Sequence, residues 1–415
     1  MTRLFAWLAG TFLAFVLAAG VLFIALLDDR PLVERGENIS PLAINQARWL
    51  FNTNDPRRFR QGEVRTTAIP VTLLDEGLNA LASRSLKGRG ALIVGEEKAE
   101  IRITRRIDLL AGDRYLNVRA IIQEGQGEPR IVAATIGSHS IPPFLVYAML
   151  NTGIRMAGHG REWALARQAI RQLDFDPGRR RVVISYAWEP SLLDHARAIA
   201  FSPQELVHIR SAQESLAAML DHYAPGRRIP LATVLRATLD IGGSDQRENR
   251  RAVLLALGIH LGEKNIASLI PEAANWPQLR PVTMVLAGRN DSAQHFVVSA
   301  MLAAWAGEPV ADAIGLYKEL ADARLGSGFS FADLAADRAG TRFGELINRG
   351  SPRIDATLRD ELTDRDLIPN LSDLPEYISA SDFQRRFGST SSPSYRELTA
   401  EIERRLDAMP LYKPE

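Results

Sequence analysis

The sequence contains no cysteine, and this absence removes several kinds of chemistry at once. Disulfides, thiolate nucleophiles, cysteine-based zinc sites and iron–sulfur clusters are all excluded. Membrane attachment through an acylated cysteine is excluded as well. The absence is compatible with an oxidising compartment but does not establish one.

The chain also lacks an excess of charge of either sign. Its 50 Lys and Arg residues face 49 Asp and Glu residues, which leaves a formal net charge of +1. No basic stripe with interleaved aromatic residues is visible. Such a chain has no broad field that would attract nucleic acid, so we expect no nucleic-acid partner.

Motifs of several enzyme classes are missing too. The sequence has no G-x-S-x-G, no H-E-x-x-H and no Rossmann fingerprint. The glycine-containing runs at 241–244 and 326–328 lack the sequence context of phosphate-binding loops and are expected to be turns. The sequence therefore indicates no cofactor, and we assign no metal ligand.

The longest apolar run extends from Leu4 to Leu27, and its 24 residues carry no charge. A helix of this length is roughly 36 Å long, enough to cross a hydrocarbon core of about 30 Å with tilt. Arg3 precedes the run and two aspartates follow it. This bias predicts an uncleaved signal anchor in the inner (cytoplasmic) membrane, with the bulk of the chain in the periplasm. A signal peptide cleaved near residues 18–20 is the alternative.

The length of 415 residues and the 46% hydrophobic content predict two folded modules beyond this segment. Alternating apolar residues, as in Leu116 to Ile122, predict strands, and longer runs with helical spacing lie between them. After Pro190 the pattern becomes almost entirely helical.

The predicted fold class is therefore α+β: an N-terminal transmembrane helix, antiparallel β-hairpins with long helices, and then an all-α helical module. The predicted segments are an anchor at 4–27, a connector at 28–65, an α+β and possible lipid-apposed module at 66–190, a helical module at 191–367, and a tail at 368–415 with a terminal amphipathic helix.

The densest set of polar side chains lies between Asn290 and Glu345, on three consecutive helical segments. Residues three or four apart share a helix face, so each segment presents a polar group within an apolar stripe. An imidazole and several carboxylates can then converge where the helices pack, as in metal sites of helix bundles or in general acid/base catalysis. We predict catalytic roles for Glu319, His295 and Asp337, and binding roles for Asp322, Asp333, Ser299 and Lys318.

Structural roles compete with these assignments. Ser330 followed by Asp333 matches a capping box, so Asp333 is also explained as part of a helix start. Asp337 can form an ion pair with a neighbouring arginine or with Lys318. A single histidine such as His295 on an apolar face often belongs simply to the core.

Two stretches resemble known families. The segment RYLNVRAIIQEGQGEPRIVAATIGSHSIPPFLVYAML, together with its surroundings at about 60–190, resembles membrane-tethered envelope proteins related to tubular lipid-binding modules. The runs HFVVSA, GLYKELAD and SGFSFADLAADRAGTRFG, at about 290–345, are similar to YfiM-like predicted envelope proteins and more distantly to VanZ-like membrane proteins. The first resemblance implies lipid binding, and the second implies no settled activity. The positions that match the second family's pattern are His295, Glu319, Asp322, Asp333, Asp337 and Gly340.

These patterns together predict a lipid- or envelope-binding and organising component, with membrane lipid as its partner and cell-envelope glycan as a further partner class. A hydrolase or lyase of envelope glycan or lipid is the alternative, with Glu319 as general acid/base and His295 and Asp337 as orienting groups or metal ligands. A structural tether, in which the polar set only fixes the packing of the helices, is the third possibility. The sequence does not indicate an oligomeric state.

Overall fold

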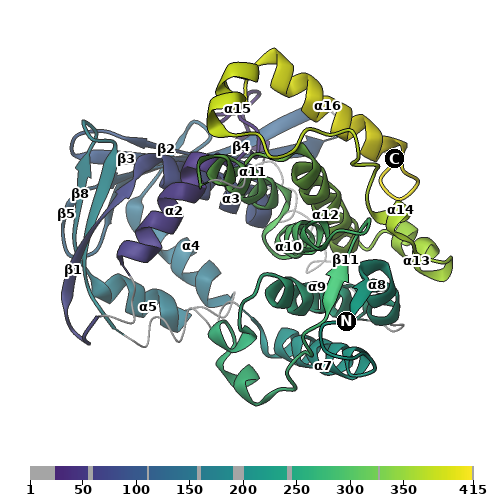
Figure 1. Cartoon of the computed structure of the whole chain (residues 1–415). Coiled ribbons are helices and arrows are strands. Elements are labelled where there is room, and N and C mark those ends of the chain that lie inside the picture. The colour runs from purple at the N-terminus through teal and green to yellow at the C-terminus, as the bar shows by residue number, and fades with distance from the viewer. Residues whose placement is uncertain are drawn as a thin grey trace, which may run out of the picture. The chain divides into compact units, whose positions relative to one another are not determined.

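The computed structural model describes residues 24–54, 59–109, 112–156, 160–189, 201–240, 245–325 and 328–413. The chain divides into two compact units, Met1–Ala196 (unit 1) and Arg197–Glu415 (unit 2) (Figure 1). The boundary falls close to Pro190, where the sequence pattern changes from mixed to helical.

Unit 1 is built from two antiparallel sheets and from helices that pack against them. The five-stranded sheet has the order β2 (Gly88–Val94), β3 (Lys98–Leu109), β4 (Gly112–Gln123), β6 (Arg130–Ile136) and β7 (His139–Ile141). The four-stranded sheet has the order β1 (Val64–Pro70), β9 (Arg181–Ala187), β8 (Ile170–Asp176) and β5 (Gly125–Gln126). The helices are α2 (Pro41–Thr53), α3 (Val71–Leu86), α4 (Pro143–Met156) and α5 (Gly160–Ala169). Consecutive strands joined by short turns give the predicted hairpins.

Residues 28–33 belong to unit 1, although the sequence placed them in a connector. Asp28 pairs with Tyr115 at the start of β4 through two backbone hydrogen bonds of 2.9 Å. The amides of Leu32 and Val33 each donate to the Thr104 hydroxyl at 3.0 Å. Asn117 completes this set, because its side-chain oxygen accepts from Leu32 at 2.9 Å. Two buried polar side chains of the sheet thus hold a segment that has no regular structure of its own.

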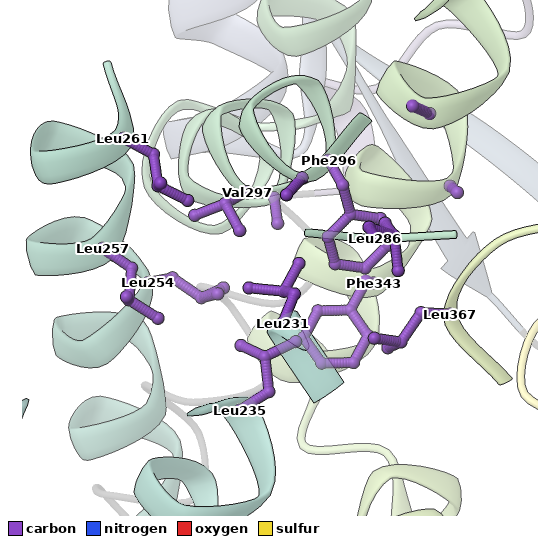
Figure 2. Close-up of a cluster of buried hydrophobic side chains, with 14 of the residues drawn as sticks. Leu231, Leu235, Leu254, Leu257, Leu261, Leu286, Phe296, Val297, Phe343 and Leu367 are labelled. Carbon is purple, nitrogen blue, oxygen red and sulfur yellow. The ribbon is translucent and has the colours of Figure 1, made fainter. Parts of the chain in front are cut away.

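Unit 2 is mostly helical. Its helices are α7 (Pro203–Leu220), α8 (Leu231–Leu239), α9 (Gln246–Leu261), α10 (Asn290–Ala306), α11 (Glu308–Leu325), α12 (Phe331–Arg349), α13 (Pro352–Arg359), α14 (Asp364–Leu367), α15 (Ala380–Arg386) and α16 (Pro393–Ala408). Two short 3-10 helices, Ile266–Ser268 and Pro271–Asn275, lie between α9 and α10. Apolar side chains from α8, α9, α10 and α12 meet in one core (Figure 2).

The segment expected as a tail contributes to this core. Tyr395, Ile402 and Leu406 of α16 are buried, and so is Tyr412 beyond it. The Tyr412 hydroxyl donates to the Leu367 carbonyl oxygen at 2.8 Å. Residues 368–413 therefore fold as part of unit 2.

Two glycines let α10 and α12 approach closely. A Cβ atom at Gly340 would lie 2.1 Å from the Phe296 carbonyl oxygen, and one at Gly344 would lie 2.2 Å from that of Ala300. Such distances are far inside van der Waals contact, so no larger residue fits without separating the helices. The backbone contact sets the spacing between α10 and α12.

The predicted fold class is wrong in two respects. No helix among the described residues is long and apolar enough to cross a membrane. Residues 4–23 of the predicted transmembrane helix lie outside the described residues, and its C-terminal end belongs to unit 1, where Leu27 is buried and the Leu26 carbonyl lies against Gly137. The helical module is also not all-α, because β10 (Arg228–Pro230) and β11 (Thr283–Val285) form a parallel pair.

Candidate functional site

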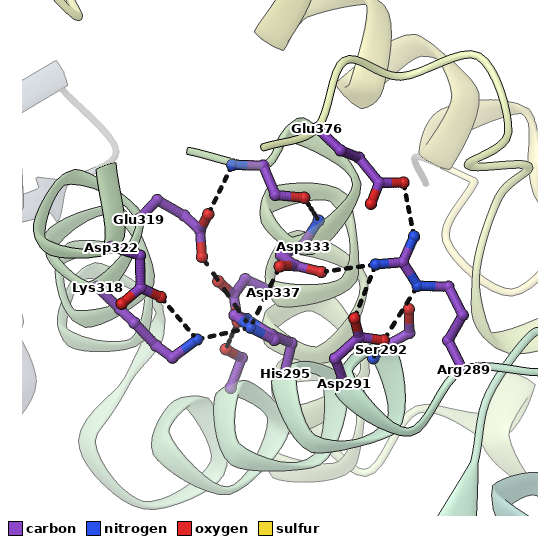
Figure 3. Close-up of polar contacts among 12 residues, drawn as sticks. Arg289, Asp291, Ser292, His295, Lys318, Glu319, Asp322, Asp333, Asp337 and Glu376 are labelled. Carbon is purple, nitrogen blue, oxygen red and sulfur yellow. Dashed lines mark hydrogen bonds and ion pairs between the residues drawn. The ribbon is translucent and has the colours of Figure 1, made fainter. Parts of the chain in front are cut away.

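Three consecutive helices of unit 2 bring the predicted polar residues together (Figure 3). His295 and Ser299 come from α10, Lys318, Glu319 and Asp322 from α11, and Asp333 and Asp337 from α12. The start of α12 is fixed by Ser330, whose hydroxyl accepts from the Asp333 amide at 3.0 Å. We call His295, Glu319, Asp333 and Asp337 the polar cluster.

His295 is held by Asp337. Its Nδ1 lies 3.0 Å from Asp337 Oδ1, and the Ser299 hydroxyl donates to the same oxygen at 2.8 Å. A carboxylate at this position favours a proton on Nδ1, which leaves Nε2 directed towards the rest of the cluster. From Nε2, Asp333 Oδ2 is 3.7 Å away and Glu319 Oε1 is 4.0 Å away. The imidazole therefore links all three carboxyl groups.

Glu319 is the most deeply buried member of the cluster, with 1% of its surface exposed. Its Oε2 accepts from the Ser330 amide at 2.9 Å. Its Oε1 is buried without a hydrogen-bond partner, and so is Asp337 Oδ2. Gly315 leaves the space for that Asp337 oxygen, since a Cβ atom there would lie 2.8 Å from it. The cluster thus contains unsatisfied acceptors in its interior, which is unusual in folded proteins.

Burial and mutual charge shift the pKa values of the cluster. Burial raises the pKa of Glu319 to about 8, although His295 opposes the shift. Burial lowers the pKa of His295, but the Asp337 carboxylate outweighs it and raises the value to about 9. The pKa of Asp333 is also raised by burial. Carboxyl groups with raised pKa values are typical of functional sites, and they also occur in structural networks.

Lys318 and Asp322 form the rim of the cluster. The Lys318 Nζ lies 2.7 Å from His295 Nε2 and 3.3 Å from Asp322, while half of the Lys318 side chain is exposed. Its ammonium group can donate to Nε2 only when the imidazole is neutral, and at pH values below the raised pKa of His295 the two positive groups repel each other. The rim therefore places a flexible positive charge beside the buried carboxyl groups.

A second set of charges beside the cluster was not predicted from the sequence. Arg289 forms ion pairs with Asp291 at 2.8 Å and with Glu376 at 2.6 Å, and it lies 3.5 Å from Asp333. Glu376 comes from the segment between α14 and α15. Residue spacing within a helix cannot predict that this segment lies beside the start of α10. The one local sign of this charge network in the sequence is the spacing of Arg289 and Asp291. They lie two residues apart at the start of α10 and can form an ion pair.

Asp312 is a partly buried carboxyl group of α11 that lies outside the cluster. It forms an ion pair with Arg338 of α12, and Glu308 and Glu403 lie nearby. Burial raises the pKa of Asp312 to about 6, against the opposing effect of Arg338. A carboxyl group with a raised pKa contributes stability below its unfolded pKa, near 4, and this contribution is lost as the pH rises through about 6.

We therefore expect Asp312→Asn to become progressively more stable than the parent chain as the pH rises from 4 to 7. The difference in the free energy of unfolding should reach about 2 kcal/mol, measured by urea denaturation at several pH values. Asp382→Asn is the control, because Arg385 and Ser379 lower the pKa of this exposed group. Parallel pH profiles for the Asp312→Asn and parent chains would contradict the expectation.

Unit 1 carries a different candidate feature, an exposed apolar face on α4. This helix has no buried residue, and Phe144 (68% exposed), Leu145, Met149 (61%), Leu150 and Met156 are all exposed. The helix is fixed to unit 1 by Tyr147, whose hydroxyl accepts from the Ile131 amide at 2.8 Å. Exposed apolar stripes of this kind mark interaction surfaces.

Comparison of the chain with family models, curated proteins and solved structures found no match in any of the three. The resemblances to tubular lipid-binding modules and to YfiM-like proteins therefore stay predictions.

Proposed function

We propose that the protein is a binding component that rests on a lipid surface through α4 of unit 1. The observation that supports this proposal is the apolar outward face of α4, which includes Leu145, Met149 and Met156. Burying a large apolar side chain contributes about 1.5–3 kcal/mol, so a few such residues suffice for reversible attachment to a membrane.

The orientation of α4 is set by polar contacts on its inner side. The Tyr147 hydroxyl donates to the Pro129 carbonyl oxygen at 3.0 Å, and Asn151 Oδ1 accepts from the Trp163 indole at 2.7 Å. These two residues are one turn apart and hold one side of the helix against β6 and α5. Rotation that would hide Met149, on the opposite side of the helix, would break both contacts.

Two neighbouring features favour lipid as the occupant of this face. Arg155, in the last turn of α4, is exposed and adds a positive charge beside the apolar stripe, as in helices that lie at membrane interfaces. The described end of the N-terminal apolar run also lies in unit 1, where the Leu26 carbonyl lies against Gly137. Gly137 precedes α4 by only a short stretch of chain that contains β7. Localisation at the inner membrane, facing the periplasm, stays a prediction.

The absence of cysteine permits a site-specific test on the full-length chain. Met149→Cys, labelled with an environment-sensitive fluorophore, is mixed with vesicles of phosphatidylethanolamine and phosphatidylglycerol. We expect a blue shift of the emission and quenching by a quencher attached to the acyl chains, because residue 149 should lie among them. Labelled Val207→Cys is the matched control, since Val207 of α7 is exposed to a similar extent, 67%.

The control label should stay in water even if another part of the chain binds the vesicles. Equal emission and equal quenching at positions 149 and 207 would contradict the proposal. Quenching by a soluble agent alone at position 149 would contradict it as well.

The alternative of a hydrolase or lyase of envelope glycan or lipid is supported by the convergence of Glu319, His295 and Asp337. Their burial counts against it, because His295, Glu319 and Asp337 expose no more than 5% of their surface to a substrate chain. The third possibility, a tether in which the cluster only fixes helix packing, does not explain the unsatisfied oxygens of Glu319 and Asp337. These oxygens lead to a different inference.

A further inference from the structure

We propose that the polar cluster of unit 2 binds one divalent transition-metal cation of the Zn²⁺ or Mn²⁺ class, held by His295, Glu319 and Asp337, with Asp333 beside them. One ligand atom of each of the first three residues lies within 4.8 Å of the others. This site lies in a different unit from α4, so it stands or fails independently of the lipid-binding proposal.

The unsatisfied carboxyl oxygens are the first argument for a cation. Glu319 Oε1 and Asp337 Oδ2 are buried and have no hydrogen-bond partner. A buried acceptor without a partner is costly, and a cation between such oxygens satisfies them together. A cluster with a purely structural role would be expected to pair these atoms with donors, as it pairs Asp337 Oδ1 with Ser299.

The distances are close to those of a metal site. Ligands of a tetrahedral zinc ion, with bonds of about 2.0–2.1 Å, lie about 3.3 Å from one another. From His295 Nε2, the carboxyl oxygens of Asp333 and Glu319 are 3.7 and 4.0 Å away. Movements of less than about 1 Å bring these atoms to ligand spacing. The ligand atoms of His295, Glu319 and Asp337, which lie within 4.8 Å of one another, reach this spacing by movements of up to about 1.5 Å.

The donor types select the class of ion. One imidazole nitrogen with carboxylate oxygens suits zinc, manganese or iron, whereas calcium and magnesium prefer oxygen alone. Asp337 Oδ1 contacts Nδ1 of His295, the type of contact that orients ligating histidines in metalloproteins, so the unpaired Oδ2 is the Asp337 atom that is available as a ligand. Gly315 preserves space beside Asp337 Oδ2.

Lys318 takes the place of the cation in this structure. Its ammonium lies 2.7 Å from His295 Nε2, on the side that a metal would occupy. Half of its side chain is exposed, and Asp322, one turn further along α11, is already within 3.3 Å. Movement of Lys318 towards Asp322 vacates the position at Nε2. We therefore expect Lys318 to compete with the metal.

The test uses the untagged full-length chain, stripped of metal with a chelator and titrated separately with Zn²⁺ and Mn²⁺. We expect one tightly bound equivalent, measured by elemental analysis after gel filtration, and affinity about 100-fold weaker in Glu319→Gln. Lys318→Met should bind about tenfold more tightly than the parent chain, because the competing ammonium is gone. His222→Ala is the matched control, since His222 is exposed on unit 2 and lies outside the cluster, and its affinity should not change.

No bound equivalent in the parent chain would overturn the proposal. So would undiminished binding in Glu319→Gln, which would locate the metal elsewhere. The electronic spectrum of the parent chain with Co²⁺ provides a test that does not depend on the folding of a variant. An intense visible band, typical of four or five ligands, supports the site, whereas a weak spectrum like that of the hydrated ion counts against it.

Discussion

Gly340→Ala is expected to lower the free energy of unfolding of unit 2 by about 3 kcal/mol or more. The added Cβ would meet the Phe296 carbonyl oxygen at 2.1 Å. This atom belongs to the backbone of α10 and cannot rotate away, so the two helices must separate and the neighbouring core must repack. The loss should exceed the gain of roughly 1 kcal/mol that alanine normally brings to a helix interior. Urea denaturation, followed by tryptophan fluorescence and circular dichroism, measures the change.

Gly77→Ala is the control for this prediction. Gly77 also lies within a helix, α3, but no atom lies within 4 Å of the position that a Cβ would take. Alanine should therefore stabilise unit 1 by about 0.5–1 kcal/mol through helix propensity alone. If Gly340→Ala were as stable as the parent chain, the close contact between α10 and α12 would be disproved.

The second large effect is expected at Arg250 of α9. Its side chain is 5% exposed, donates to the Leu239 carbonyl oxygen at 3.0 Å and pairs with Asp355 of α13 at 2.6 Å. Asp355→Ala leaves a buried guanidinium without its counter-charge and should lower the free energy of unfolding of unit 2 by about 3 kcal/mol. Denaturation in urea at neutral pH measures the loss.

A double mutant separates the penalty of an unpaired charge from the value of the pair. Arg250→Met keeps an apolar side chain of similar length and removes the charge. The combined Arg250→Met and Asp355→Ala chain should therefore be more stable than Asp355→Ala alone. If the two losses simply added, Arg250 would not depend on Asp355 for its counter-charge.

Much of unit 2 follows from helical spacing. The three consecutive helical segments expected between Asn290 and Glu345 correspond to α10, α11 and α12. Short connections between long helices favour packing of chain neighbours against one another. The convergence of His295, Glu319 and Asp337 could therefore be predicted without knowing the structure, because each lies on the inward face of its own helix.

Other features depend on contacts that no local pattern encodes. Thr104 and Asn117 bind residues 32 and 33, which lie more than 70 positions away in the sequence. Because no local pattern shows these contacts, the sequence predicted a connector at 28–65. Likewise, the parallel pairing of β10 and β11 joins two strands of three residues each, too short for an alternating pattern. The predicted anchor extended through Leu27 because apolar content alone does not show where the chain joins unit 1. In the structure Leu27 is buried, and the next residue, Asp28, pairs with Tyr115.

The paired glycines of α12 also determine which part of the cluster can adapt. Since α10 and α12 touch through their main chains, the positions from which His295 and Asp337 extend are effectively fixed. If the proposed cation binds, a larger or smaller ion would then be accommodated mainly by α11, which supplies Glu319, and by the Asp333 side chain. Selectivity for ionic radius would then depend mainly on the position of α11. Substitutions on the side of α11 that faces away from the cluster would change this selectivity without altering any ligand.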